Sequence, residues 1–246
     1  MTVETNSSHL DVPLLHADGL NTYYGTSHIL RDVALHVRRK EAVTLLGRNG
    51  MGKTTLLRTL AGLTPARTGT IAINGTEMRG ARASAIARAG IAFVPEDRGI
   101  FPNLTVLENL TFAARPPAHD QDAWTLERVH SLFPRLHERQ NHWGNQLSGG
   151  EQKMLAIARA LLTNPRLILL DEATEGLAPK VREQIWTTLR LILDSGIAAV
   201  IVDKNLDDLL VLADRHIVLA KGEVMFDGTT AMLKADEALI HRHLGV

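Results

Sequence analysis

A glycine-rich loop between a predicted strand and a predicted helix constrains this chain more than any other feature. It lies in the segment Ala42–Leu60, AVTLLGRNGMGKTTLLRTL. The first five residues are apolar and predict a buried strand, and a helix is predicted to begin at Lys53. Between the two, the sequence matches G-x-x-x-x-G-K-T, the P-loop pattern. Because the motif is complete and lies in a strand–loop–helix context, a chance glycine turn is a poor alternative.

The residue types of this loop suit a polyphosphate. Gly47, Gly50 and Gly52 allow the turn and let backbone N–H groups approach the phosphates closely. The following helix directs its free N–H groups and the positive end of its dipole to the same place. We expect Lys53 to reach the β- and γ-phosphates and the Thr54 hydroxyl to ligate Mg²⁺.

Composition narrows the class of protein. The chain has 246 residues, 45% of them hydrophobic, which is enough for one large domain or one domain with a lobe. A formal net charge of zero disfavours a nucleic-acid binder that works through bulk charge, and the lack of cysteine excludes disulfides and thiolate metal sites. No apolar run approaches the ~20 residues that span a bilayer, and the polar segment Met1–Pro13, predicted to be a loose tail, lacks the features of a signal peptide. These features indicate a soluble cytoplasmic protein that would reach a membrane only through a partner.

Strands and helices alternate along most of the chain, which predicts an α/β fold. The alternation stops after Glu96, and we interpret the following part, about 96–163, as a helical lobe inserted in a single domain of residues 14–246. Leu63–Gly69 is predicted to be a turn, and a polar, histidine-rich turn is predicted after Phe133. The predicted strands are Leu14–Thr22, Val33–Val37, Ala42–Leu46, Thr70–Asn74, Ile91–Val94, Leu167–Leu170, Ile197–Val202, Arg215–Leu219 and Glu223–Asp227, and the predicted helices outside the two glycine motifs are Ala81–Ala89, one from near Thr105, Asp122–Phe133, Pro179–Leu193 and Leu206–Ala213.

The segment Leu147–Glu151, LSGGE, has two interpretations. Ser148 is a good N-cap for the apolar-striped helix that follows, with Glu151 placed to complete a capping box. Alternatively, a helix N-terminus with a hydroxyl and two bare glycines, Gly149 and Gly150, is a second phosphate site. The residues alone leave both open.

Two carboxylates end the apolar strand Leu167–Leu170. In open α/β sheets, ligands bind at the carboxyl ends of such strands. Asp171 is placed to hold Mg²⁺, directly or through water, and Glu172 is placed to polarise an attacking water. A solvated acidic loop is a weak alternative, because a P-loop lies upstream.

Aromatic and histidine side chains carry weaker signals. Tyr23 and Tyr24 end a predicted strand, and they either cover the core or, for Tyr24, stack on adenine; the two interpretations are evenly matched. His130, His137 and His142 have no spacing that resembles a metal site, so we expect solvated surface histidines.

The order P-loop, LSGGEQ, LILLDE resembles the ATP-binding subunit of an ABC transporter, over nearly all of the chain from about Leu14. The more detailed resemblance is to the branched-chain amino acid importer type, and to the second of its paired ATPases. It rests on GRNGMGKTTLLRTLAGL, VPEDRGIFPNLTVLENL, LSGGEQKMLAIARALL and LLDEATEGLAP. It implies a P-loop NTPase core of RecA-like type, with a mixed, mostly parallel sheet, flanking helices, an antiparallel β edge and the inserted helical lobe.

The resemblance also implies ATP and Mg²⁺ as ligands and assigns roles by position. Tyr24 would stack on adenine, and Leu147–Glu151 would close over the γ-phosphate of ATP held by the opposite subunit. The loop Glu175–Ala178 would contact that subunit. Glu96 replaces the usual Gln and would face Mg²⁺, whereas Lys204 replaces the usual His and keeps a positive charge near the γ-phosphate. The implied catalytic residues are Glu172, Lys53 and Lys204. The implied metal ligands are Thr54, Glu96 and Asp171. The implied nucleotide-binding residues also include the phosphate cradle, which is Gly47, Arg48, Asn49, Gly50, Met51, Gly52, Lys53, Thr54 and Thr55, together with Ser148, Gly149 and Gly150.

The implied partners are a second ATPase subunit, identical or paralogous, two integral membrane permease subunits and, indirectly, a periplasmic substrate-binding protein. The chain would then lie at the cytoplasmic face of the inner membrane and drive import of branched-chain amino acids or a related amino acid or amide, without nucleic acid. One alternative is an ABC-type regulatory ATP-binding module with little turnover, which Lys204 motivates. Another is a soluble ABC ATPase that acts on DNA or ribosomes, although the chain lacks the insertions typical of that class. A small-molecule P-loop kinase would leave LSGGE without a role.

Overall fold

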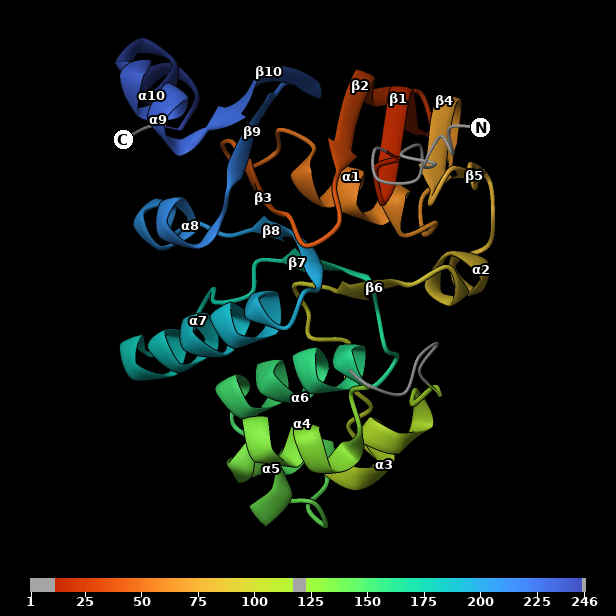
Figure 1. Cartoon of the computed structure of the whole chain (residues 1–246), viewed down its shortest axis with the longest axis vertical. Coiled ribbons are helices and arrows are strands. Elements are labelled where there is room, and N and C mark those ends of the chain that lie inside the picture. The colour runs from red at the N-terminus through yellow and green to blue at the C-terminus, as the bar shows by residue number, and fades with distance from the viewer. Residues whose placement is uncertain (1–11, 117–122, 245–246) are drawn as a thin grey trace, which may run out of the picture.

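The computed structural model describes residues 12–116 and 123–244, so nearly all of the predicted tail lies outside the described residues. Figure 1 shows two sheets with helices between and around them. The antiparallel sheet has the strand order β2-β1-β4-β5, and the six-stranded sheet has the order β10-β9-β3-β8-β7-β6. The strands are β1 (Leu15–Tyr24), β2 (Ser27–Val37), β3 (Ala42–Leu46), β4 (Ala66–Ile73), β5 (Thr76–Glu77), β6 (Ile91–Val94), β7 (Leu167–Asp171), β8 (Ala198–Val202), β9 (Arg215–Ala220) and β10 (Glu223–Thr229).

The helices follow the predicted pattern closely in the core. The P-loop helix begins at Lys53, as expected. The helices are α1 (Lys53–Leu60), α2 (Ala83–Arg88), α3 (Val106–Phe112), α4 (Leu126–Leu132), α5 (Pro134–Glu138), α6 (Gly149–Leu161), α7 (Pro179–Asp194), α8 (Leu206–Leu212), α9 (Thr230–Ala235) and α10 (Glu237–His243).

Parallel pairing brings three loops to one edge of the six-stranded sheet. β3 pairs in parallel with β8 and β9, and β7 pairs in parallel with β6 and β8. Asp171 lies opposite Val202 in the register, so the residues that follow β7 and β8 meet at the carboxyl edge. The P-loop leaves β3 at that same edge, where ligands bind in open α/β sheets.

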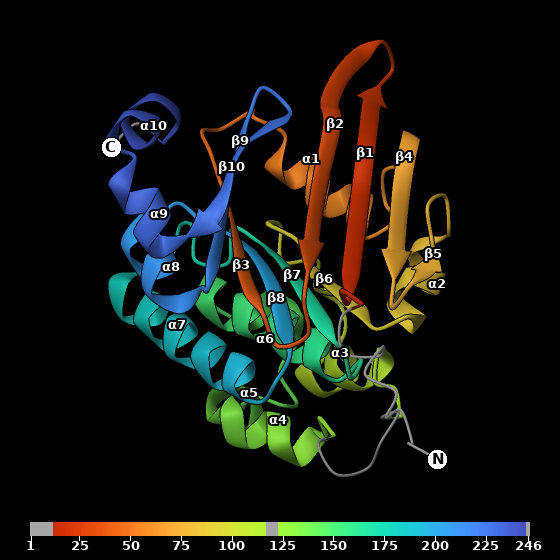
Figure 2. The same cartoon turned by 45° about the horizontal axis from the view of Figure 1, so that its top comes forward.

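The central strands are buried on both faces, which explains their continuous apolar runs. In β7, Leu167 and Leu169 belong to the apolar cluster shared with α1 and the antiparallel sheet. Ile168 and Leu170, which point the opposite way, belong to the cluster shared with α6 and α7. Figure 2 shows this layering, with α6 and α7 on one face of the sheet and the antiparallel strands on the other side.

Between β6 and β7 the described residues form α3–α6 and a short 3₁₀ turn, and a single β-bridge joins Thr105 to Trp143. Asn109, which is fully buried, fastens the loop after β6 to α3. Its Oδ1 accepts from the Phe101 backbone N–H (2.8 Å), and its Nδ2 donates to the Phe101 carbonyl (2.9 Å). The limits of the lobe, 96–163, remain a prediction.

Two predicted turns are wrong. The strand β4 begins at Ala66, inside the turn predicted at Leu63–Gly69, because its polar first half pairs with β1 although it lacks an apolar signal. Gly69 lies in this strand where its backbone comes close to that of β1. A Cβ at this position would lie 2.5 Å from the Gly19 carbonyl oxygen. The polar stretch after Phe133 forms the short helix α5, which has a proline at its first position, where the missing N–H costs nothing.

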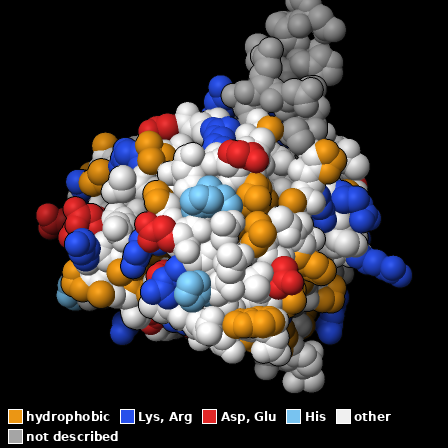
Figure 3. Space-filling model, turned by 90° about the horizontal axis from the view of Figure 1, so that it is seen from below, with side chains coloured by type: hydrophobic (Ala, Val, Ile, Leu, Met, Phe, Trp, Pro, Cys, Tyr) orange, Lys and Arg blue, Asp and Glu red, His pale blue; other side chains and the backbone are white. Residues whose placement is uncertain are grey.

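The surface of the lobe mixes side chains of every kind. Figure 3 views the molecule from below and shows acidic and basic side chains interspersed with apolar ones and histidines. His137 and His142 are exposed, as predicted, but His130 is partly buried and its Nδ1 lies 3.0 Å from the Nδ1 of His137.

Among the described helices, none has the length and apolar character needed to cross a membrane.

Candidate functional site

The loop after β3 forms a tight cradle with its lysine folded into it. Lys53 Nζ donates to the carbonyl oxygens of Gly47 (2.6 Å) and Arg48 (3.0 Å). Burial lowers the pKa of Lys53, although the carboxylate of Asp171 acts in the opposite direction. At Gly47, φ is 139° and a Cβ would lie 2.2 Å from the Leu219 carbonyl oxygen, so only glycine fits. The loop therefore presents a buried ammonium group and bare backbone, as a phosphate site requires.

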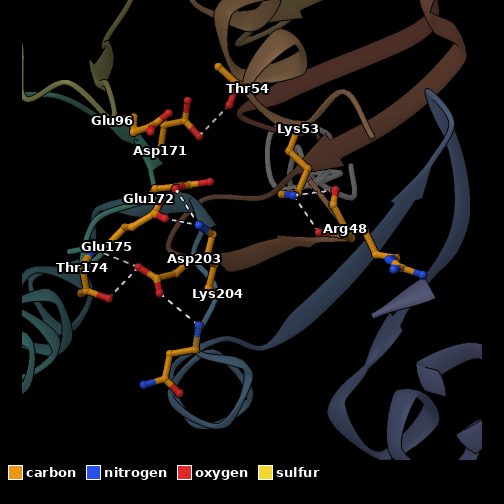
Figure 4. Close-up of polar contacts among 12 residues, drawn as sticks. Arg48, Lys53, Thr54, Glu96, Asp171, Glu172, Thr174, Glu175, Asp203 and Lys204 are labelled. Atoms are coloured by element: carbon orange, nitrogen blue, oxygen red, sulfur yellow. Dashed lines mark hydrogen bonds and ion pairs between the residues drawn. The ribbon is translucent and has the colours of Figure 1, made fainter. Parts of the chain in front are cut away.

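A hydroxyl and a buried carboxylate meet beside this loop. Thr54 Oγ1 donates to Asp171 Oδ1 at 3.2 Å. Asp171 is only 1% exposed, and its Oδ2 has no hydrogen-bond partner in the described residues. Burial raises the pKa of Asp171, and the nearby Glu96 carboxylate adds to the effect. Figure 4 shows Glu96 next to Asp171, and both line a cavity of about 440 Å³ together with Thr54. An unpaired carboxylate oxygen beside a hydroxyl fits a hard divalent cation such as Mg²⁺, so the predicted ligands lie together.

Glu172 is held in place by its backbone. Its backbone φ is +47°, a conformation that residues other than glycine rarely adopt. Its N–H donates to the Val202 carbonyl at 2.9 Å. Glu172 and Lys204 both line a cavity of about 680 Å³ with Gly47 and Lys53, which is large enough for a nucleotide. The predicted catalytic residues therefore face one cavity.

Lys204 lies beside two members of a three-carboxylate cluster. Oxygens of Glu96, Glu172 and Glu175 all lie within 4.8 Å of one another. Lys204 Nζ hydrogen-bonds to Glu175 and lies 3.8 Å from Glu172 Oε2. The lysine therefore neutralises part of this cluster, in addition to the role near a phosphate that its position implies.

Asp203 fastens two of the edge loops together, a role that the sequence analysis did not assign. It is buried, and its Oδ2 accepts from both the N–H (2.9 Å) and the hydroxyl (2.8 Å) of Thr174. Its Oδ1 accepts from the N–H of Asn205 at 3.1 Å. Figure 4 shows these bonds joining the loop after β7 to the loop after β8. The only sequence signal is a carboxylate at the end of an apolar strand.

Lys153 of α6 is the second residue that the sequence analysis missed. It is 3% exposed, and its Nζ donates to the carbonyls of Pro95 (3.0 Å), Asp171 (3.3 Å) and Glu96 (3.4 Å). One ammonium group thus joins the Glu96 loop to the end of β7. Lys153 lies three residues before Ala156 and four before Ile157, which are both buried, so helical spacing could have placed it on the inner face.

Burial lowers the pKa of Lys153 from 10.5 to about 8. Between these pH values the unfolded chain holds a proton that the folded chain has released, so stability rises with pH, whereas below pH 8 the cost of burying the charge is fully present. We expect the free energy of unfolding of the wild type, relative to Lys153→Met, to rise by up to about 3 kcal/mol between pH 8 and 10.5. Urea unfolding of both proteins across that range measures it. Parallel stability curves would show that folding does not lower the pKa of Lys153.

The two predicted aromatic residues, Tyr23 and Tyr24, are not among the residues that line the cavity around Lys53. Tyr24 is 48% exposed at the end of β1, with its hydroxyl 3.3 Å from Thr64 Oγ1, and the P-loop cavity lining does not include it. Tyr23 stacks on His28 and lies under the guanidinium of Arg67. Adenine stacking by Tyr24 stays a prediction.

The LSGGE segment forms the predicted capping box. Ser148 Oγ accepts from the Glu151 N–H, and the Glu151 carboxylate accepts from the Ser148 N–H at 2.8 Å. A Cβ at Gly150 would meet Val181 of α7 at 2.4 Å, so this glycine allows the helices to approach closely. Ser148, Gly149 and Gly150 are not among the residues that line the chain's own P-loop cavity, and their phosphate role stays a prediction.

Comparison with known proteins gives consistent results. Residues 30–175 match the family described as "ABC transporter". The chain is 41% identical to the high-affinity branched-chain amino acid transport ATP-binding protein BraG of Pseudomonas aeruginosa, over 94% of this chain and 100% of BraG. A nucleotide-free ATP-binding cassette from an ABC transporter superposes with a TM-score of 0.80 at 22% identity, covering 96% of this chain and 99% of that chain. A dimeric ATP-binding cassette in a post-hydrolysis state, bound to ADP and Pi, superposes with a TM-score of 0.75 at 27% identity, covering 88% and 98%.

Proposed function

The chain belongs to the ABC transporter family of ATP-binding proteins, an ATPase family with the fold described above, and from that premise we propose that it is the ATP-hydrolysing subunit of an importer for branched-chain amino acids or a related amino acid or amide. The observation that carries the hydrolytic part is the convergence of Lys53, Asp171 and Glu172 at one edge of the sheet. The cargo class rests on the likeness to BraG, which extends over that protein's whole length.

The chemistry follows from where each side chain lies. Phosphate oxygens would replace the backbone carbonyls as acceptors for Lys53 Nζ, because a charged hydrogen bond to an anion is the stronger one. Thr54 and Asp171 would hold Mg²⁺, which neutralises charge that develops on the phosphates. Glu172, fixed by its backbone bond to Val202, would accept a proton from the attacking water.

A second subunit is part of the proposal. The exposed Ser148 cap is separate from the cavity that holds Lys53, so a phosphate role for it requires nucleotide held by another chain. Two such subunits, identical or paralogous, would enclose two ATP molecules and act on two membrane permease subunits at the cytoplasmic face of the inner membrane. A periplasmic substrate-binding protein would deliver the cargo.

Two experiments test this assembly. An affinity-tagged chain, recovered from a detergent extract of its source cells, should bring down integral membrane proteins and an ATPase partner; recovery of ribosomal proteins or DNA without membrane proteins would contradict it. Cells that lack the chain should lose uptake of labelled leucine, and the wild-type chain should restore that uptake. If the complex forms but leucine uptake is unaffected, the cargo class is wrong.

One observation favours a second candidate, a regulatory ATP-binding module with little turnover. Lys204 is bonded to Glu175 and lies 3.8 Å from Glu172, so it could hold the proposed base in an ion pair. Our expectation is that the wild type hydrolyses ATP and that Lys204→His changes kcat less than about fivefold, since the Lys204 side chain is 50% exposed and an ion pair made by an exposed side chain contributes little. If the wild type binds ATP without turnover and Lys204→His raises kcat at least tenfold, the regulatory function is favoured instead.

A further inference from the structure

A second cavity, of about 650 Å³, shares no lining residue with the cavities around the P-loop. It lies where β4, β5 and α2 meet the C-terminal side of α6 and the start of β7. Its described lining residues include three arginines, Arg88, Arg115 and Arg166, and no aspartate, glutamate or lysine. The fold therefore gathers three positive charges from three distant parts of the chain in one concave place.

These charges have no counter-charge within the described part of the chain. None of the three guanidinium groups has a hydrogen-bond or ion-pair partner there, and the Nη1 of Arg115 is buried without an acceptor. The nearest carboxylate along β5, that of Glu77, accepts from the backbone N–H groups of Ile71 and Arg79. A buried donor that lacks an acceptor is rare in native proteins and requires an explanation.

The backbone fixes two of the arginines independently of their side chains. The N–H of Arg115 donates to the Leu162 carbonyl at 2.9 Å, and its carbonyl accepts from Asn164 Nδ2 at 2.8 Å. The N–H of Arg166 donates to the Gly90 carbonyl at 2.8 Å. The main chain that carries Arg115 and Arg166 is thus fixed by bonds that do not use the guanidinium groups.

We propose that this cavity binds a small organic molecule that carries phosphate groups. Guanidinium groups pair with phosphate oxygens through two parallel N–H bonds, and the three unpaired arginines of this cavity offer such groups together. The volume is in the range of small-molecule sites. Asn74 and Thr76 offer hydrogen bonds to hydroxyl groups, and Ile73 and Met78 offer apolar contact, so the site suits a phosphate ester better than a bare ion.

Isothermal titration with fructose 1,6-bisphosphate as the probe tests the site. The P-loop is first saturated with a non-hydrolysable ATP analogue and Mg²⁺, so that it cannot take up the probe. We expect binding at a 1:1 ratio that Arg115→Gln and Arg166→Gln each weaken at least tenfold, and that Arg31→Gln, an exposed arginine elsewhere, leaves unchanged. Binding should also weaken as salt increases.

Two results would overturn the proposal. The first is no binding, or undiminished binding by the Arg115→Gln/Arg166→Gln double variant. The second is binding to phosphatidylglycerol vesicles through these arginines while the soluble probe fails, which would make the ligand a lipid headgroup. Thermal unfolding and Arg115→Lys, which keeps the charge, separate loss of the site from loss of the fold.

Discussion

Glu172→Gln should lower the rate of Mg-ATP hydrolysis by a factor of about 10² to 10⁴, the usual contribution of a general base. Glutamine has almost the same shape but cannot accept the proton of the attacking water. The N–H bond to Val202 and the unusual φ of +47° belong to the backbone, so the replacement leaves them intact. Nucleotide affinity should therefore stay within a few-fold of the wild type.

Steady-state hydrolysis and equilibrium binding of ATP measure the two quantities separately. Glu175→Gln is the matched control, because it makes the same chemical change three residues further on and also contacts Lys204. It should retain at least a fifth of the wild-type rate. If Glu172→Gln keeps a comparable rate, another group is the base. If wild type and Glu172→Gln are equally inactive although both bind ATP, a partner subunit is missing.

Gly47→Ala should disrupt the P-loop more than any other single methyl group added to it. The new Cβ would lie 2.2 Å from the Leu219 carbonyl oxygen, which belongs to the backbone of β9 and cannot rotate away. The φ of 139° adds strain of about 1–3 kcal/mol, and relief of the clash requires β3 and β9 to separate. We expect a loss of at least about 3 kcal/mol in the free energy of unfolding and a fall in ATP affinity of at least 100-fold.

Gly50→Ala is the control for this effect. Gly50 also has a positive φ, 77°, but a Cβ there would meet nothing within 4 Å. Its cost should be limited to the left-handed conformation, about 1–2 kcal/mol. Urea unfolding of both variants gives the comparison, and an equal loss of stability would show that backbone conformation, and not contact with β9, makes Gly47 necessary.

Local features of the sequence predicted the chemistry of the site. The strand limits Ala42–Leu46 and Ile91–Val94 agree with the structure, as does the capping box of Ser148 and Glu151. These features depend on residues close together in the chain, where apolar periodicity and capping act directly. The order of the motifs indicated the family, and with it the fold.

Long-range contacts decided the rest. The second half of the turn predicted at Leu63–Gly69 is strand from Ala66 on, because pairing with β1 outweighed its polar character. Lys153 reaches the carbonyl of Pro95, 58 residues away, and the three arginines of the second cavity come from separate elements. No window of the sequence contains both partners of such a contact. Which loops become neighbours follows from the strand order β10-β9-β3-β8-β7-β6, which joins strands far apart in the chain. The sequence by itself thus predicted which groups carry the proposed chemistry, whereas the tertiary structure determined which charges are buried, and against what.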